Sequence, residues 1–124
     1  MIDSDVLIEI LDCGSEKGEQ ALKQTIESGE QIATTVINLH EVLYCLHKYG
    51  KPVKELLLLP ILGYTKKDAE LSGKIEQEAE KNGKNASRTD AMIAAIAINS
   101  RAKLYTFNGK HFAVFQDCGL ELFL

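Results

Sequence analysis

Cysteine is scarce in this chain and follows no functional spacing. The three cysteines, Cys13, Cys45 and Cys118, are odd in number, far apart and outside any CxxC pattern. Disulfide frameworks and structural zinc sites need paired or closely spaced cysteines. The sequence therefore predicts neither, and we expect these thiols to be buried as small hydrophobic side chains.

Long hydrophobic runs are absent as well. The longest, at residues 56–62 and 91–98, are far shorter than the roughly 20 apolar residues that span a bilayer. The chain also does not open with a basic region, an apolar stretch and a small-residue cleavage site. We therefore expect no membrane association, no secretion signal and a cytoplasmic protein.

The chain has no excess of positive charge. Its formal net charge is −4, which argues against binding nucleic acid through a broad basic surface, so any such contact must be local. Hydrophobic residues make up 45% of the chain and charged residues 26%, a composition that indicates a folded rather than a disordered or fibrous protein. At 124 residues, we expect a single domain over residues 1–124.

Helical and extended segments alternate along the sequence. Extended segments are expected at residues 1–3, 31–34, 60–64 and 103–106, with weaker candidates at 113–115 and 120–123. Helices are expected over residues 3–11, 16–28, 35–49, 52–58, 66–81 and 90–98, with a turn or short helical start at 108–109. This alternation is typical of the α/β class, with helices on both faces of a central, mainly parallel sheet.

Oxygen-bearing side chains follow several of the expected strands. Asp3 ends the first one, Glu41 lies in the helix after the second, Asp90 opens the late apolar helix, and Asn108 follows another strand. Because the carboxyl ends of parallel strands share one edge of a sheet, we expect these groups to gather there. Hard cations such as Mg²⁺ prefer oxygen ligands, and such an ion can activate water and neutralise charge on a scissile phosphate.

Four segments carry a family resemblance: residues 2–8 (IDSDVLI), 35–43 (TVINLHEVL), 89–95 (TDAMIAA) and 104–112 (LYTFNGKHF). Together they resemble a PIN domain, and they are closest to the VapC-like toxin ribonucleases of bacterial and archaeal toxin–antitoxin pairs. Each segment alone is a weak signal, but the four occur in the family's order over nearly the whole chain. Only Met1 and Ile2 precede Asp3, so either the first strand is very short or the natural start lies upstream.

The resemblance implies a three-layer α/β/α domain with a sheet of four to five strands. It further implies an Mg²⁺- or Mn²⁺-dependent endoribonuclease whose metal is held by Asp3, Glu41 and Asp90. Where the family often has a further acid, this chain has Asn108, an amide that can still ligate a metal. An RNA substrate, a small antitoxin that covers the site and a homodimer are implied as partners.

Four further side chains are candidates for a weaker, substrate-binding role. For Asp5, the two interpretations are a cap of the first helix and support of the site. For Thr106, they are a side chain that lines the site and an ordinary strand residue. Arg88 and Lys110 contact phosphate or are simply solvated. The three histidines share no metal-binding spacing, and we expect them to be structural or exposed.

Structural roles compete with catalytic ones for the main acids. Asp90 completes a Ser87-x-x-Asp90 capping-box pattern, and it is expected to serve both purposes. Glu41 has Ile37 and Cys45 one turn away on either side, which suggests a partly buried position.

Two other functions remain open. The Asp3-x-Asp5 pattern resembles the nucleophile motif of haloacid-dehalogenase phosphatases, but the late acid pair of that family is missing. A PIN-like fold used only as a binding scaffold is the second alternative. The leucine-rich segment at residues 56–62, with Tyr64, is either a partner interface or, as we expect, part of the core.

Overall fold

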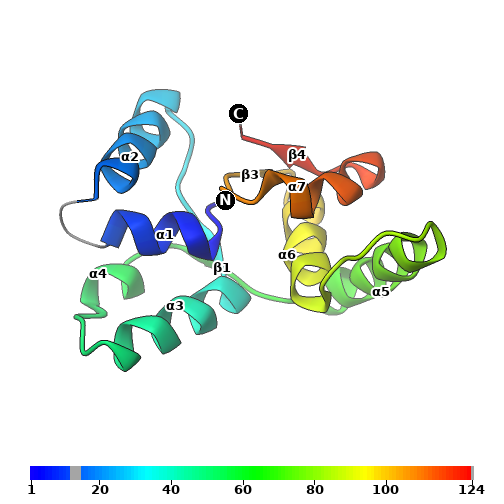
Figure 1. Ribbon diagram of the computed structural model, residues 1–124, viewed down its shortest axis with the longest axis horizontal. Helices are drawn as coiled ribbons and strands as arrows, with labels where there is room; N and C mark the ends of the chain where they lie inside the picture. The colour runs from blue at the N-terminus through cyan, green and yellow to red at the C-terminus, as the bar shows by residue number, and fades with distance from the viewer. Residues whose placement is uncertain (12–14, 124) are drawn as a thin grey trace.

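The computed structural model describes residues 1–11 and 15–123, so the expectation for Cys13 lies outside the described residues. Most of the regular structure is helical (Figure 1). The helices are α1 (Ser4–Leu11), α2 (Glu16–Ser28), α3 (Val36–Lys48), α4 (Lys54–Leu57), α5 (Lys66–Lys81), α6 (Arg88–Asn99), α7 (Gly109–Phe112) and the 3-10 helix η1 (Ala113–Cys118). The strands are β1 (Thr34–Thr35), β2 (Ile61–Leu62), β3 (Lys103–Leu104) and β4 (Glu121–Leu122). None of the described helices is both long and apolar enough to cross a bilayer.

All strand pairs are parallel, as expected, but the strands are very short. β1 pairs with β2 and β3 pairs with β4, in two separate two-stranded sheets. The N-terminal segment lies between the pairs, because the Ile2 amide donates to the Ala33 carbonyl (2.8 Å) and the Asp3 amide to the Tyr105 carbonyl (2.9 Å). Among the described residues, the expected sheet of four to five regular strands is thus not seen. The expected parallel pairing and mixed α/β content are both present.

Helices cover both faces of these extended segments. Met1 and Leu104 point into one apolar core, which is completed by α5, α6, α7 and η1. Their chain neighbours Ile2 and Tyr105 point into a second core, completed by α1 to α4. Adjacent residues of an extended segment face opposite sides, and Figure 1 shows the two groups of helices on either side of the N-terminal segment. Asp3 follows directly, at the carboxyl end of this segment.

Local signals set the helix boundaries. The Thr65 hydroxyl accepts from the Asp68 amide (3.3 Å), and the Asp68 carboxylate accepts from the Thr65 amide (2.9 Å), a capping box that starts α5. Gly29 ends α2 with a φ of 70°, which a residue with a side chain rarely adopts. Gly18 lets α2 pack closely on α1, since a Cβ there would lie 1.9 Å from the Glu9 carbonyl oxygen.

Three predictions about individual segments were wrong. Residues 113–115, expected as a strand, begin the 3-10 helix η1, because Phe112 and Phe115 are both fully buried and a three-residue turn puts them on one side. The leucine-rich segment is not all core: Leu56 is buried, but Leu57 is 55% and Leu58 76% exposed. The helix there is also shorter than the expected 52–58.

Candidate active site

The Asp3 carboxylate is buried and held by donors from three segments. Its Oδ1 accepts from the Ser4 amide and from Asn38 Nδ2, both at 2.9 Å. Its Oδ2 accepts from the Thr106 hydroxyl at 2.8 Å. Only 7% of Asp3 is exposed, so these bonds replace water that the carboxylate has lost. The arrangement fixes the plane of the carboxylate at the carboxyl end of the N-terminal extended segment.

Asp90 lies in the first turn of α6, half-buried and within electrostatic reach of Asp3. Its amide donates to the Ser87 hydroxyl at 3.1 Å, so Ser87 caps the helix as expected. The pKa of Asp90 is raised, first by burial and also by the Asp3 charge. A hydrogen bond with the Ser87 side chain and the charge of His111 oppose this shift. The two acids therefore share one region of negative potential.

Asp5 belongs to the same acidic region. Burial and, next, the Asp3 charge raise the pKa of Asp5, against smaller opposing contributions that include hydrogen bonds from the Val6 and Phe107 amides. Asp5 Oδ2 accepts from the Phe107 amide at 3.2 Å. Its Oδ1 is buried and has no hydrogen-bond partner among the described residues. We refer to Asp3, Asp5 and Asp90 together as the acidic cluster.

Glu41 is exposed on α3, which corrects the expectation of a partly buried position. The buried line of α3 runs instead through Asn38, Val42 and Leu46, and Glu41 lies beside it on the solvent side. Glu41 Oε1 accepts from the Ser4 hydroxyl at 2.8 Å. It is therefore connected to the residue that follows Asp3, at the outer rim of the acidic cluster.

The remaining candidates occupy different surroundings. Thr106 contacts Asp3 and also accepts from the Asn108 amide at 3.0 Å, which places Asn108 beside the cluster at the exposed start of α7. Lys110 is exposed on α7. Arg88 donates to Glu76 of α5 at 3.2 and 3.3 Å, and this ion pair raises the pKa of Arg88.

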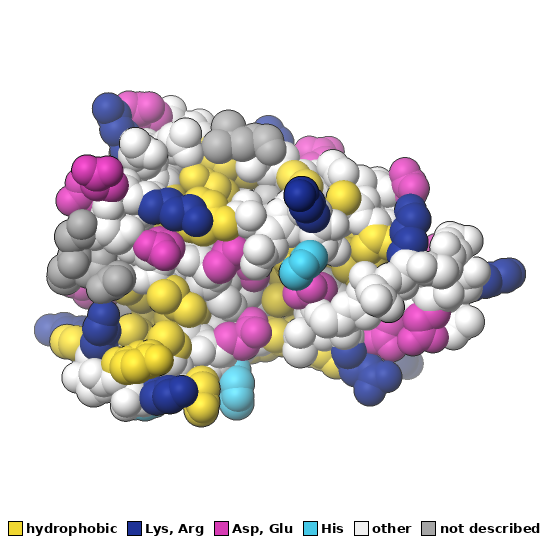
Figure 2. Space-filling view, in the orientation of Figure 1, with side chains coloured by type: hydrophobic (Ala, Val, Ile, Leu, Met, Phe, Trp, Pro, Cys, Tyr) yellow, Lys and Arg dark blue, Asp and Glu magenta, His cyan; other side chains and the backbone are white. Residues whose placement is uncertain are grey.

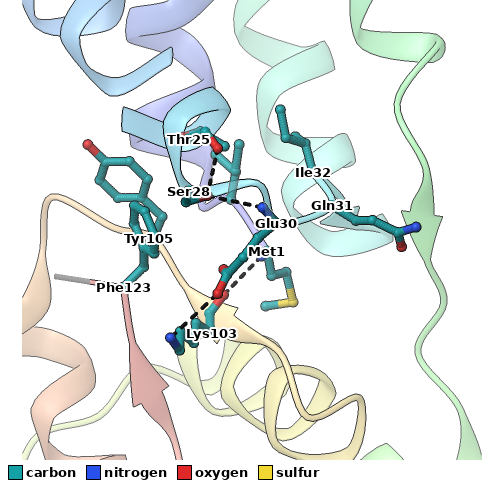
Figure 3. Close-up of a pocket in the computed structure, with 10 residues that line it drawn as sticks. Met1, Thr25, Ser28, Glu30, Gln31, Ile32, Lys103, Tyr105 and Phe123 are labelled. Carbon is teal, nitrogen blue, oxygen red and sulfur yellow. Dashed lines mark hydrogen bonds and ion pairs between the residues drawn. The ribbon is translucent and has the colours of Figure 1, made fainter. Parts of the chain in front are cut away.

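The face of the molecule seen in Figure 2 is mixed in charge. On the face shown in Figure 2, acidic and basic side chains are interspersed and no broad basic area is present. Figure 3 shows a pocket whose lining contains no residue of the acidic cluster and includes Met1, Glu30 and Lys103. The Met1 ammonium donates to the Lys103 carbonyl (2.9 Å), and the Lys103 ammonium pairs with Glu30 (3.4 Å). The charged groups of this pocket are thus already paired.

The family model of the PIN domain matches residues 1–116. The chain belongs to the PIN domain family. No curated protein matches it, but several solved structures do. A toxin–antitoxin complex from Klebsiella pneumoniae is 28% identical, with a TM-score of 0.72 over 90% of this chain and 88% of that one.

Two further structures share the fold at lower identity. VapBC2 of Rickettsia felis, bound to a DNA fragment from its promoter, has a TM-score of 0.81 at 24% identity, over 99% of this chain and 96% of that one. FitAcB of Neisseria gonorrhoeae has a TM-score of 0.80 at 19% identity, over 99% and 95%. These likenesses support the α/β class despite the short strands. Because the chain belongs to the PIN domain family, the haloacid-dehalogenase phosphatase hypothesis is left without support.

Sequence reasoning missed three polar residues of this PIN domain that lie at the acidic cluster. Asn38 and Ser4 contact Asp3 directly, and His111 is near enough to lower the pKa of Asp90. A signal for Asn38 was present, because Asn38, Val42 and Leu46 recur every four residues and thus share one helix face. An amide on an otherwise apolar buried face needs polar partners.

The acidic cluster has the chemistry of a site for a hard cation. Among the described residues, no group of three His, Cys, Asp or Glu side chains forms a ready metal-binding set. Mg²⁺, however, needs only one or two carboxylates, with waters and substrate phosphates as its other ligands. Asp3 uses three of the roughly four lone pairs of a carboxylate, and the half-buried Asp90 carboxylate lies within electrostatic reach of it. These oxygens fit Mg²⁺ or Mn²⁺.

Proposed function

We propose that this PIN domain is a metal-dependent endoribonuclease that hydrolyses RNA phosphodiester bonds. The observation that carries the proposal is the Asp3 carboxylate, buried and fixed by three hydrogen bonds, beside Asp5 and Asp90, whose pKa values are raised first by burial and further by the Asp3 charge. Folding concentrates negative charge here at a cost that a bound cation would offset.

Asp3 and Asp90 would hold Mg²⁺ or Mn²⁺, with Glu41 and Asn108 at the rim. The ion would lower the pKa of the attacking water and neutralise charge on the scissile phosphate. The chain's own contribution is positioning. Thr106 fixes Asp3, and the Ser87 cap orients the first turn of α6 with Asp90. Lys110, exposed on the neighbouring α7, would contact a substrate phosphate.

We further propose that the nuclease is the toxin of a toxin–antitoxin pair. The support is the likeness to the Klebsiella pneumoniae toxin–antitoxin complex, which covers most of both chains. The partner would be a small antitoxin protein that covers the acidic cluster, and the nuclease would itself be a homodimer. Exposed apolar side chains at the end of α4, Leu57 and Leu58, are available for such contacts.

A non-catalytic PIN scaffold is the second candidate. It is favoured by Asn108, which replaces an acid often found in the family, and by the lack of a ready three-ligand group among the described residues. A scaffold needs no affinity for Mn²⁺, so metal binding and RNA cleavage separate the two functions.

The test is Mn²⁺-dependent cleavage of a labelled single-stranded RNA by wild type and by Asp3→Asn, Asp90→Asn and Asp5→Asn. The Asp3→Asn variant should fold, because its amide oxygen can face Ser4 and Asn38 while the Thr106 hydroxyl turns to accept from the new NH₂ group. We expect cleavage to be lost with Asp3→Asn and Asp90→Asn and largely kept with Asp5→Asn. No cleavage by folded wild type, with no Mn²⁺ binding, would favour the scaffold.

A further inference from the structure

Asn38 is a polar side chain in an apolar setting. It lies in the first turn of α3 and is 0% exposed. On the same helix face, Val42 and Leu46 pack into the core formed by α1 to α4. Asparagine is mostly found at protein surfaces, and a buried amide without partners costs free energy. A buried asparagine at this position therefore needs specific hydrogen-bond partners.

The Asn38 amide makes hydrogen bonds in three directions. Its Nδ2 donates to Asp3 Oδ1 and to the Ser4 hydroxyl, both at 2.9 Å. Its Oδ1 accepts from the Thr35 hydroxyl at 2.8 Å. Both N–H donors and one side of the carbonyl are therefore used, and no donor of this buried group is left unsatisfied.

The partners also fix which way the amide points. An ionised Asp3 carboxylate can only accept, so the NH₂ group must face it. The Thr35 hydroxyl accepts from the Asn38 backbone amide at 3.1 Å, which leaves its own proton free for Asn38 Oδ1. Reversing the amide would place its oxygen against the carboxylate and its NH₂ group against a hydroxyl that already accepts. Asn38 thus has one orientation.

The contacts reach a second carboxylate. The Ser4 hydroxyl accepts from Asn38 and donates to Glu41 Oε1 at 2.8 Å. Asn38 therefore contacts Asp3 directly and Glu41 through one hydroxyl. Two acids that are 38 positions apart in the sequence are connected by a single buried amide.

We infer that Asn38 is a positioning residue, which sets the orientation of the Asp3 and Glu41 carboxylates for the cation. The inference rests on the proposed function, because it assigns these carboxylates to a metal site. Groups that orient metal ligands from behind typically change metal affinity or activity by roughly 10- to 100-fold when they are removed. The Ser4 hydroxyl connects Asn38 to Glu41, so its removal should change the orientation of the Glu41 carboxylate only.

The chain offers a matched control for the loss of an amide. Asn99 Nδ2 donates to the Asp68 carboxylate at 2.8 Å, also between a helix side chain and a buried acid. Asn99 ends α6, about 14 Å along the helix axis from Asp90. Asn99→Ala removes the same type of hydrogen bond as Asn38→Ala, but far from the acidic cluster.

The experiment has two readouts on wild type, Asn38→Ala, Ser4→Ala and Asn99→Ala. The first is the ¹³C NMR signals of the side-chain carboxyl groups in metal-free protein. The Asp3 and Glu41 signals should move in Asn38→Ala, only the Glu41 signal in Ser4→Ala, and neither in Asn99→Ala. The second readout is titration with Mn²⁺ alone, where Asn38→Ala should bind about 10- to 100-fold more weakly, and Asn99→Ala within about twofold of wild type.

The outcomes separate this inference from the proposed function. If Asn38→Ala binds Mn²⁺ as tightly as Asn99→Ala does, Asn38 has no positioning role, while the nuclease proposal stands. If wild type binds no Mn²⁺, the proposed function fails, and the carboxyl signals then decide alone whether Asn38 orients the two acids. Unchanged Asp3 and Glu41 signals in Asn38→Ala overturn the role in either case. If Asn38→Ala does not fold, Ser4→Ala decides. An unchanged Glu41 signal together with unchanged Mn²⁺ affinity in Ser4→Ala overturns the positioning role, and a change in both supports it.

Discussion

The hydroxyl of Thr106 should contribute measurably to stability, because it supplies the donor to Asp3 Oδ2. Thr106→Val keeps the shape of the side chain and removes this bond, together with the acceptor for the Asn108 amide. A hydrogen bond to a charged group contributes about 1.5–3 kcal/mol. Asn108 is exposed, so water can replace its lost partner. We therefore expect a loss of about 2 kcal/mol in the free energy of unfolding.

For a chain of 124 residues, an unfolding entropy of about 2.1 cal/mol/K per residue converts this loss to a Tm lower by about 8 °C. Calorimetry on metal-free protein measures it. Thr106→Ser, which retains the hydroxyl, should lose less than half as much. Equal Tm values for the valine and serine variants would refute the account of how the Asp3 carboxylate is held.

Three further predictions concern stability away from Thr106. The pKa of Asp90 is raised in the folded state, so the free energy of unfolding falls as the pH rises from about 4 through the raised pKa. Urea titrations should show Asp90→Asn more stable than wild type at neutral pH and equally stable near pH 3. A stability difference between the two proteins that does not change with pH would contradict this. Gly18→Ala should destabilise by about 1–3 kcal/mol, because its Cβ would meet the Glu9 carbonyl. By contrast, Gly73→Ala in α5 should stabilise by about 0.5–1 kcal/mol, because the added Cβ would meet no described residue within 4 Å apart from the backbone of its own helix. The opposite order of the two Tm values would show that α1 and α2 are less closely packed.

The boundaries of the helices were largely predictable because local residues set them. Thr65 and Asp68 form a capping box within four residues, and α5 runs over the expected 66–81. Ser15 and Gly29 likewise bracket α2 over the expected 16–28. Such signals act between neighbours in the sequence, so periodicity and capping chemistry suffice to find them.

The extent of the sheet was not predictable in the same way. A strand is defined by hydrogen bonds to a distant segment, and only two residues of each strand pair regularly. Along residues 112–115, the burial of Phe112 and Phe115 on one side favours a 3-10 turn over the expected strand. Burial of this kind depends on where α6 lies, and short apolar runs do not encode it.

The site was predictable in its acids but not in its polar support. Asp3 stands out because it ends an extended segment, and Asp90 because it opens an apolar helix; the structure brings the two within electrostatic reach. Glu41 was expected to be partly buried, since helical spacing alone does not tell which side of Val42 faces solvent. Asn38 was overlooked because Asp3 and Ser4, which accept hydrogen bonds from its Nδ2, are distant in the sequence, and only the fold brings them to it.

The central claim is that the acidic cluster holds a divalent cation, and the thermal stability of wild type and Asp3→Asn with and without Mn²⁺ tests it most directly. At a concentration 100 times its Kd, a ligand that binds only the folded state stabilises it by about 2.7 kcal/mol. The account predicts that Mn²⁺ raises the Tm of wild type accordingly and leaves that of Asp3→Asn unchanged. An equal rise in both proteins, or no rise in wild type, would contradict it.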